Sequence, residues 1–341
     1  MRTDEFDYSL PDGLIAQHPE AERPSSRLLV LDRLSGRVDH SRFREITAYL
    51  RENDLIVVND TKVIRARLAG VKETGGRVDI LLTEKLDGRR WSCLATGFRK
   101  GTREARISVD GTPLTLRAAP LHWTVEFPEE VDGADFLARH GRMPLPHYIK
   151  RAKAGAESGD DEERYQTVYA REEGSIAAPT AGLHFDEDLL RRIGAMGVGI
   201  VRITLHVGIG TFFLIKSEHV EGHEMHKERY HLSPEAYDRV SKTKEEGGRV
   251  IAVGTRAVRT LETVGAGGNG AALAGSTGLF IHPGYRFRVV DALITNFHLP
   301  RSTPLLLVCA FAGKERIESA YREAIGLGYR FYSYGDAMFI S

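Results

Sequence analysis

The chain has 341 residues, of which 42% are apolar and 28% charged, a composition typical of a globular protein with one large domain or two of ordinary size. Lys and Arg together balance Asp and Glu, so the formal net charge is zero, which counts mildly against a nucleic-acid partner. No apolar run approaches the roughly 18 residues that cross a bilayer, and two distant cysteines, Cys93 and Cys309, argue against a disulfide framework or a cysteine zinc site.

The N-terminal residues 1–13 are acidic and lack an apolar stretch, so we do not expect them to be a secretory signal peptide. Together with the low cysteine content, this predicts a cytoplasmic protein.

The first half of the chain contains two kinds of predicted strand. Residues 54–58 read Asp-Leu-Ile-Val-Val, the continuous apolar run of a strand buried on both faces. From about residue 60 to 135 the candidate strands are short and separated by Gly-containing turns, as at 77–83, 91–96 and 114–117. Short strands at close spacing favour a small antiparallel barrel or sandwich.

After about residue 180, helices and strands alternate. Asp186 is a suitable N-cap for a helix that ends at Gly197, and Ser233-Pro234 opens another that ends at Gly247. The remaining predictions are strands at 198–205, 249–253, 289–295 and 329–334, and helices from 255, near 304–312 and at 314–325. Residues 265–270 are predicted to form a flexible surface loop, and 151–163 a polar, mobile connection.

The alternation predicts an α/β main domain, with an open or barrel-like mixed sheet and helices, interrupted by a smaller all-β, barrel-like domain. The predicted main domain is discontinuous and comprises residues 1–60 and 145–341. The predicted insertion comprises residues 61–144.

Polar side chains follow the predicted strands at several points. Residues 174–185 are small and nearly uncharged and include Thr180 and His184; a tight structural turn explains them equally well. His206 comes directly after a predicted strand, with Gly208 and Gly210 making room for a ligand and Thr211 offering a hydroxyl. Because ligands of α/β proteins bind at the carboxyl ends of strands, this position favours a binding site.

Residues 221–230 are the most polar of these segments and invite a metal interpretation. However, His223 and His226 are three residues apart, whereas the helical zinc motif needs four. In an extended chain His226, Glu228 and Tyr230 would share one face, an arrangement that suits hydrogen bonding to a polar ligand. Ligand binding or acid–base chemistry, metal binding and a structural role all stay open at this stage.

The C-terminal third offers three further clusters. Thr255 and Arg259 lie at the start of a predicted helix, where free N–H groups attract an anion; an ordinary capped helix is the alternative. The others are Thr295, Asn296 and His298 after a predicted strand, and Asp336 near the C-terminus. Several such clusters in one domain suggest a shared pocket.

Residues 136–154 contain basic side chains and no acidic one. This stretch is either a solvated surface or a local site for phosphates, which overall neutrality does not exclude. Its candidate nucleic-acid contacts are Arg139, Arg142, Lys150 and Arg151.

Taken together, these segments resemble the S-adenosylmethionine:tRNA ribosyltransferase-isomerases of queuosine biosynthesis, the QueA family. The resemblance follows the chain in order over nearly its whole length. It rests on SRLLVLDR (26–33), VVNDTKVI (57–64), GRMPLPHYIKR (141–151), ERYQTVYA (163–170), APTAGLHF (178–185), TLHVGIGTF (204–212), HEMHKERY (223–230), VGTRAVRTLE (253–262), FIHPGYRFRVVDALITNFHLPRST (280–303) and YSYGDAMFI (332–340). The departures from the family pattern are small: Arg65, His147, Phe213 and Arg256-Ala257, and they weaken any role for Phe213 and Arg256.

The resemblance implies a monomeric enzyme with an α/β domain, an inserted β-barrel and no metal or prosthetic group. S-adenosylmethionine would be its co-substrate, and its partner would be tRNA carrying 7-aminomethyl-7-deazaguanine at the wobble position. The ribosyl part of S-adenosylmethionine would be transferred to that amine and isomerised, which gives epoxyqueuosine and releases adenine and methionine. The competing hypotheses are a metal-dependent hydrolase using His223, His226 and Glu228, and a non-catalytic tRNA-binding module.

This chemistry needs a base beside the sulfonium, an acid for adenine departure and a neutral attacking amine, and histidine suits each task near pH 7. We therefore expect catalytic roles among His184, His206, His226, Glu228 and Asp336. The expected substrate-binding residues are Thr180, Gly208, Gly210, Thr211, His223, Tyr230, Thr255, Arg259, Thr295, Asn296 and His298.

Overall fold

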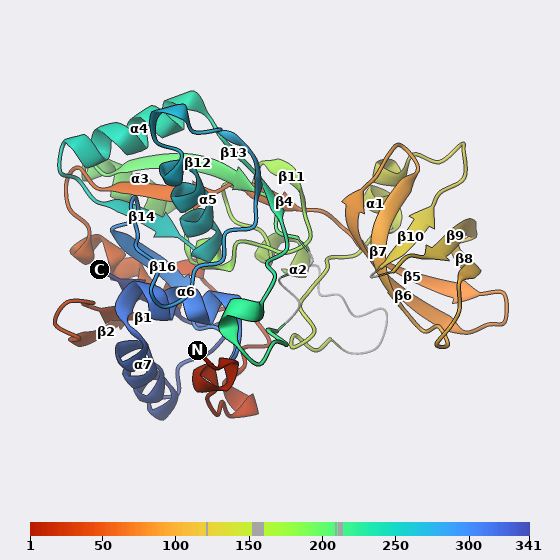
Figure 1. Cartoon of the computed structure of the whole chain (residues 1–341), viewed down its shortest axis with the longest axis horizontal. Helices are drawn as coiled ribbons and strands as arrows, with labels where there is room; N and C mark the ends of the chain where they lie inside the picture. The colour runs from red at the N-terminus through yellow and green to blue at the C-terminus, as the bar shows by residue number, and fades with distance from the viewer. Residues whose placement is uncertain (121, 152–159, 209, 211–213) are drawn as a thin grey trace.

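The computed structural model describes residues 1–120, 122–151, 160–208, 210 and 214–341. Its larger part is a nine-stranded mixed sheet with helices, and its smaller part is a closed six-stranded antiparallel barrel, drawn to the right in Figure 1. The predicted fold class is therefore confirmed. No helix in the described part of the chain is both long and apolar enough to cross a membrane.

The nine-stranded sheet places one set of strand ends along a single edge. Strands β12, β3, β14 and β16 run parallel to one another, whereas β13 is antiparallel to β12, and β17 is antiparallel to β16. The edge where the four parallel strands end is called the carboxyl edge below. In spatial order the strands are β15 (Ala274–Thr277), β13 (Glu228–Leu232), β12 (Gly199–Leu205), β3 (Leu55–Asn59), β14 (Val250–Val253), β16 (Ala292–Asn296), β17 (Ala337–Ile340), β1 (Arg27–Leu31) and β2 (Val38–Arg42).

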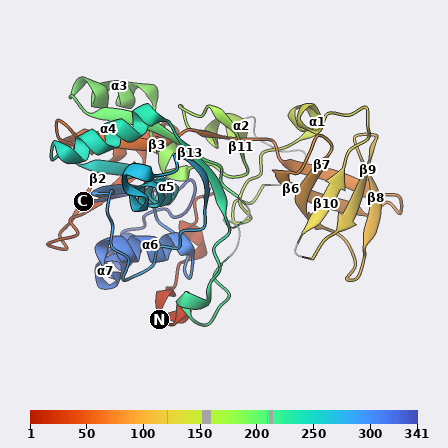
Figure 2. The same cartoon turned by 45° about the horizontal axis from the view of Figure 1, so that its top comes forward.

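The central strand β3 is buried on both faces, as its apolar run predicts. Leu55 and Val57 belong to one hydrophobic core, and Ile56 and Val58 to the other. Figure 2 shows α3 on one side of the sheet and α6 and α7 on the other. The helices of this part are α3 (Glu187–Ala195), α4 (Pro234–Glu245), α5 (Thr255–Ala266), α6 (Thr303–Ala312) and α7 (Lys314–Gly326).

The helices begin where capping side chains predict. Asp186 accepts a hydrogen bond from the backbone N–H of Leu189 at 2.7 Å and starts α3. Ser233 accepts one from Ala236 at 3.2 Å and starts α4, with Pro234 at the first helical position. Side-chain caps of this kind satisfy backbone donors that the first turn leaves without partners.

The barrel is built from consecutive short strands and is covered by one helix. Asp132 caps α1 (Gly133–His140), which inserts Phe136 and Leu137 into the barrel core. These elements lie within the predicted insertion, whose boundaries stay a prediction. The barrel strands are β5 (Arg67–Lys72), β6 (Arg77–Lys85), β7 (Arg90–Thr96), β8 (Glu104–Val109), β9 (Thr112–Ala118) and β10 (Trp123–Glu126); the chain also forms β4 (Thr61–Val63), α2 (Asp160–Arg164) and β11 (Glu172–Ser175).

Two local predictions need correction. The strand expected at 329–334 is wrong, because Tyr332 has a φ of 71°, which no extended strand allows; the final strand is β17 instead. The surface loop expected at 265–270 begins later, because α5 continues to Ala266. A Cβ on Gly265 would lie 2.3 Å from Val289 Cγ2, so this glycine permits close packing.

The predicted mobile connection at 151–163 is anchored at both of its described ends. Arg151 forms a two-pronged ion pair with Asp161, with both nitrogen–oxygen distances at 2.7 Å, and Asp161 lies in α2. The intervening residues 152–159 lie outside the described residues.

Candidate active site

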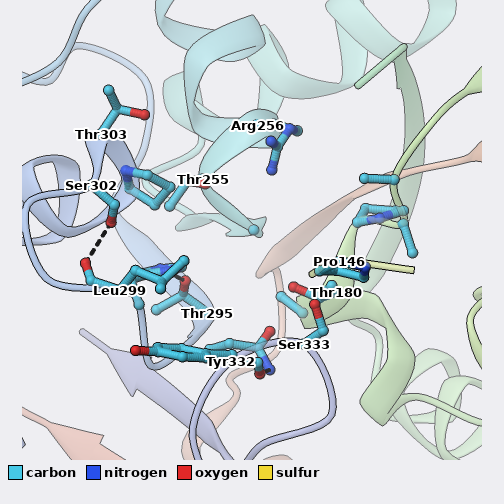
Figure 3. A pocket seen from close by; sticks show the side chains of 18 of the residues that line it. Pro146, Thr180, Thr255, Arg256, Thr295, Leu299, Ser302, Thr303, Tyr332 and Ser333 are labelled. Carbon is cyan, nitrogen blue, oxygen red and sulfur yellow. Dashed lines mark hydrogen bonds between the residues drawn. The ribbon is translucent and has the colours of Figure 1, made fainter. Parts of the chain in front are cut away.

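A pocket lies at the carboxyl edge of the nine-stranded sheet. Its walls come from the ends of β14 and β16, the starts of α5 and α6, the short helix η5 (Thr180–His184) and residues 223–228. Figure 3 shows Arg256 and Tyr332 on opposite sides of this space, with Thr180 and Ser302 at its flanks. The structure thus brings together segments that are up to about half the chain apart in sequence, as sites at the ends of parallel strands do.

Most of the expected substrate-binding residues, and two of the expected catalytic ones, line this one pocket. They are Thr180, Gly210, His223, His226, Glu228, Thr255, Arg259, Thr295, Asn296 and His298.

Several expected residues do not line it. His184 is buried behind Asn296, and His206 Nδ1 lies 2.9 Å from Thr61 Oγ1. Asp336 is buried and accepts backbone hydrogen bonds from Arg27 and Arg330.

The other residues outside the lining have contacts of their own. The Tyr230 hydroxyl donates to the Ala272 carbonyl at 3.0 Å. The Gly208 N–H donates to Glu228 Oε1 at 3.1 Å, so this glycine supports a pocket residue. Thr211 lies outside the described residues.

One end of the pocket carries a buried ionic cluster. Arg259 donates through Nη1 to Glu228 Oε2, and Arg256 Nε lies 3.6 Å from Glu228 Oε1. Burial lowers the pKa of Arg259, and the Glu228 carboxylate opposes that shift. Two guanidiniums and one carboxylate leave one net positive charge beside the N-terminus of α5, a setting that attracts an anion. Arg256, whose role the family departures put in doubt, is therefore part of the site.

The same cluster bears on the metal hypothesis. Both carboxylate oxygens of Glu228 are engaged. Oε2 accepts from Arg259, and Oε1 accepts from the Gly208 N–H and forms an ion pair with Arg256. Within the described ranges, no three His, Cys, Asp or Glu side chains are grouped so that they could hold a metal ion. These contacts give no support to the hydrolase that would use His223, His226 and Glu228.

His298 lies at the end of β16 and is fixed on several sides. Its ring Nε2 is 2.7 Å from Thr295 Oγ1. Its backbone N–H donates to the Tyr321 hydroxyl at 3.0 Å, and its backbone carbonyl accepts from the Tyr8 hydroxyl. Burial, with a smaller contribution from Arg256, lowers the pKa of His298 to about 3. The ring is therefore neutral at physiological pH and suits a fixed hydrogen-bonding role.

His223 and His226 form a more accessible pair. Burial and then the neighbouring His226 lower the pKa of His223, and its ring packs against Phe280 with centroids 5.1 Å apart. His226 is exposed and packs close to Gly210, where a Cβ would lie 3.0 Å from its Cδ2. Both side chains line the pocket and are at least partly exposed, a placement that suits acid–base catalysis.

Sequence reasoning missed an aromatic wall. Tyr148 and Tyr332 both line the pocket, with ring centroids 4.9 Å apart, and the Tyr148 hydroxyl lies 2.7 Å from Ser333 Oγ. Burial raises the pKa of both tyrosines, so both are neutral. The only available signal was that these residues fall within the family-like segments 141–151 and 332–340.

The candidate tRNA contacts fall on α1 and on the segment that follows it in the chain, which includes pocket residues 146–148. Arg139 is exposed on α1, and Lys150 is exposed just after pocket residues 146–148. Arg142 is half-buried, and its backbone pairs with Arg67. Arg151 is engaged by Asp161, with only 15% of its side chain exposed.

Comparison with known proteins agrees with this geometry. A family model described as "Queuosine biosynthesis protein" matches residues 3–340. The chain is 51% identical to the S-adenosylmethionine:tRNA ribosyltransferase-isomerases of Pelobacter propionicus and of Geobacter metallireducens, and each match covers 100% of both chains. A crystal structure of the S-adenosylmethionine tRNA ribosyltransferase from Thermotoga maritima matches 99% of this chain and 100% of its own, with 37% identity and a TM-score of 0.58. The chain therefore belongs to the queuosine biosynthesis protein family of S-adenosylmethionine:tRNA ribosyltransferase-isomerases.

Proposed function

We propose that this chain transfers and isomerises the ribosyl part of S-adenosylmethionine onto 7-aminomethyl-7-deazaguanine at the wobble position of tRNA. The products are epoxyqueuosine-tRNA, adenine and methionine. The observation that carries the proposal is the single pocket that combines a buried cationic cluster, an aromatic wall and two accessible histidines. Full-length similarity to relatives bearing this enzyme name supports the same conclusion.

The pocket suits the three chemical parts of S-adenosylmethionine. The methionine carboxylate binds at the N-terminus of α5, where Arg256 and the ionic cluster keep one net positive charge. The planar adenine packs against Tyr148 and Tyr332, because aromatic faces stack on flat bases. The ribosyl group then lies between these two ends.

We assign the proton transfers to His223 and His226. One removes the proton from the carbon beside the sulfonium, whose charge acidifies that position, and the other assists adenine departure. Glu228 holds Arg259 and Arg256 in place rather than acting as the base, because its oxygens already accept from Arg259 and from the Gly208 N–H and form an ion pair with Arg256.

The tRNA approaches along residues 139–150, which begin in α1 and include pocket residues 146–148. Arg139 and Lys150 are the exposed phosphate contacts. We also propose that the enzyme is a cytoplasmic monomer that uses no prosthetic group. Light scattering on the purified protein tests the monomer.

The decisive assay mixes the protein with S-adenosylmethionine and tRNA that carries the deazaguanine amine, and follows adenine by chromatography. Adenine should appear only with this tRNA, and not with tRNA that has guanine at the wobble position. Adenine release that does not depend on the amine would contradict the proposal.

A further inference from the structure

The side-chain amide of Asn296 is fixed in one orientation at the wall of the pocket. Asn296 ends β16, is only 2% exposed and lines the pocket. Its Nδ2 donates to the backbone carbonyl of Tyr332 at 3.1 Å. Because a carbonyl can only accept, the nitrogen and not the oxygen must face Tyr332.

His184 takes the second N–H of this amide. Its Nε2 lies 3.2 Å from Asn296 Nδ2, and its Nδ1 lies 2.8 Å from Ser26 Oγ. Burial, with smaller contributions from Arg330 and Arg23, lowers the pKa of His184 to about 3, so the ring is neutral. A neutral ring that accepts at Nε2 carries its proton on Nδ1, where it donates to Ser26.

In this arrangement no described residue donates a hydrogen bond to the side-chain carbonyl oxygen of Asn296. Oδ1 is buried and has no hydrogen-bond partner among the described residues. A buried acceptor without a partner is costly, and such atoms in native proteins call for an explanation. Both amide hydrogens are already used, so this asparagine can recognise a donor and nothing else.

The backbone around Tyr332 supports the same arrangement. Its φ of 71° is unusual for a residue other than glycine and costs free energy. This conformation places the Tyr332 carbonyl against Asn296 while the ring packs beside Tyr148. Asn296 therefore contacts the backbone of the residue whose ring forms part of the aromatic wall.

We propose that Asn296 Oδ1 accepts a hydrogen bond from the exocyclic amino group of the adenine of S-adenosylmethionine, and that His184 is a positioning residue that holds Asn296 for this contact. The inference rests on the proposed function, because it takes S-adenosylmethionine as the substrate. The aromatic wall selects the base rather than the ribose as the neighbour of Asn296, since a flat ring stacks there. In a 6-oxopurine the amino donor is replaced by a carbonyl oxygen. This second acceptor would face Oδ1 without forming a hydrogen bond and would be repelled by it.

The test compares three co-substrates with the wild-type protein and amine-bearing tRNA. They are S-adenosylmethionine, its 6-oxopurine analogue and its analogue without a 6-substituent, and kcat/KM for base release is measured for each. We expect the unsubstituted analogue to be about tenfold poorer and the 6-oxo analogue about a hundredfold poorer, as for the loss of, or opposition to, a buried hydrogen bond. In Asn296→Ala the three values should fall within about threefold of one another.

Wild-type values within threefold for all three co-substrates would overturn the inference while leaving the proposed function intact. If the wild type released no adenine from S-adenosylmethionine itself, the proposed function would fail, and the inference with it.

Two substitutions distinguish a positioning role of His184 from a role as an acid–base catalyst. His184→Gln places an acceptor oxygen near Asn296 Nδ2, so it should retain the preference for the amino-bearing base and the pH profile of kcat. His184→Ala should lose the preference. A loss of about a hundredfold or more in kcat in His184→Gln, together with loss of one limb of the pH profile, would make His184 an acid–base catalyst instead. If His184→Ala does not fold, the His184→Gln variant still tests the role of His184, and the wild-type comparison of the three co-substrates still tests the contact of Asn296.

Discussion

Glu228 and Arg259 form a buried ion pair that joins the start of β13 to α5 at the pocket, with 5% and 7% of the two residues exposed. Arg256 lies against the same carboxylate, and the Gly208 N–H donates to it. The pair therefore links the segments that hold the proposed histidines and the proposed carboxylate site.

Glu228→Gln should destabilise the protein by about 3 kcal/mol, because it leaves two largely buried guanidiniums without their counter-charge. Glutamine can still accept from the Gly208 N–H, so lost charge rather than lost shape is tested. Urea denaturation measures the change in free energy of unfolding. Glu246→Gln is the control, since the Lys242–Glu246 pair is exposed at 3.7 Å and should contribute nothing measurable. Equal stability of both variants would contradict this account of Glu228.

Arg256→Ala should raise KM for S-adenosylmethionine by about tenfold to a hundredfold, as for the loss of a charge-assisted hydrogen bond. The effect on kcat should be smaller, because the methionine carboxylate is distant from the bond that breaks at adenine. Steady-state kinetics of adenine release measures both constants. Arg191→Ala, at an exposed arginine of α3, is the matched control. A KM within twofold of wild type would place the carboxylate elsewhere.

His226→Ala should slow adenine release by about tenfold or more, the lower side of general acid–base contributions. The same assay on His223→Ala should show a comparable loss. His231→Ala provides the comparison, because His231 is exposed on the neighbouring strand β13 and does not line the pocket. Wild-type rates in both pocket variants would show that these histidines only support the fold.

His184 should make stability depend on pH. Its folded pKa of about 3 lies below the ordinary value of 6.5, so the unfolded chain binds a proton first as the pH falls. The free energy of unfolding should hold its full value above about pH 6.5 and lose about 1.4 kcal/mol per pH unit from this residue between pH 6.5 and 3.

Urea titrations at pH 8, 6.5, 5.5 and 4.5 measure this slope. His184→Gln cannot take up the proton, so its stability should fall less steeply than that of the wild type. Identical slopes for the two proteins would mean that His184 is not held neutral by burial.

The sequence predicted the fold well where chemistry is local. The buried run at 54–58 and the caps at Asp186 and Ser233 depend on neighbouring residues, and the structure places elements there. The strand expected at 329–334 failed because alternating aromatic residues resemble a strand, whereas the positive φ of Tyr332 depends on tertiary packing.

The site was predictable in part for the same reason. Polar residues at strand ends, such as Thr295 and His298, are visible as a pattern and do line the pocket. The pattern does not show how deeply a side chain is buried, however. His184 and Asp336 resemble site residues in sequence, yet contacts from distant segments bury them. Tyr148 lies far from those strand ends in sequence, so only the fold brings it to the pocket.

Transfer of the ribosyl group to tRNA is tested most directly by following the ribosyl carbons. S-adenosylmethionine labelled in the ribosyl group is incubated with the protein and amine-bearing tRNA, and both the label in tRNA and the free adenine are quantified. One labelled group should appear on the wobble nucleoside for each adenine released. Adenine release without label in tRNA would contradict this transfer and would show a hydrolase instead.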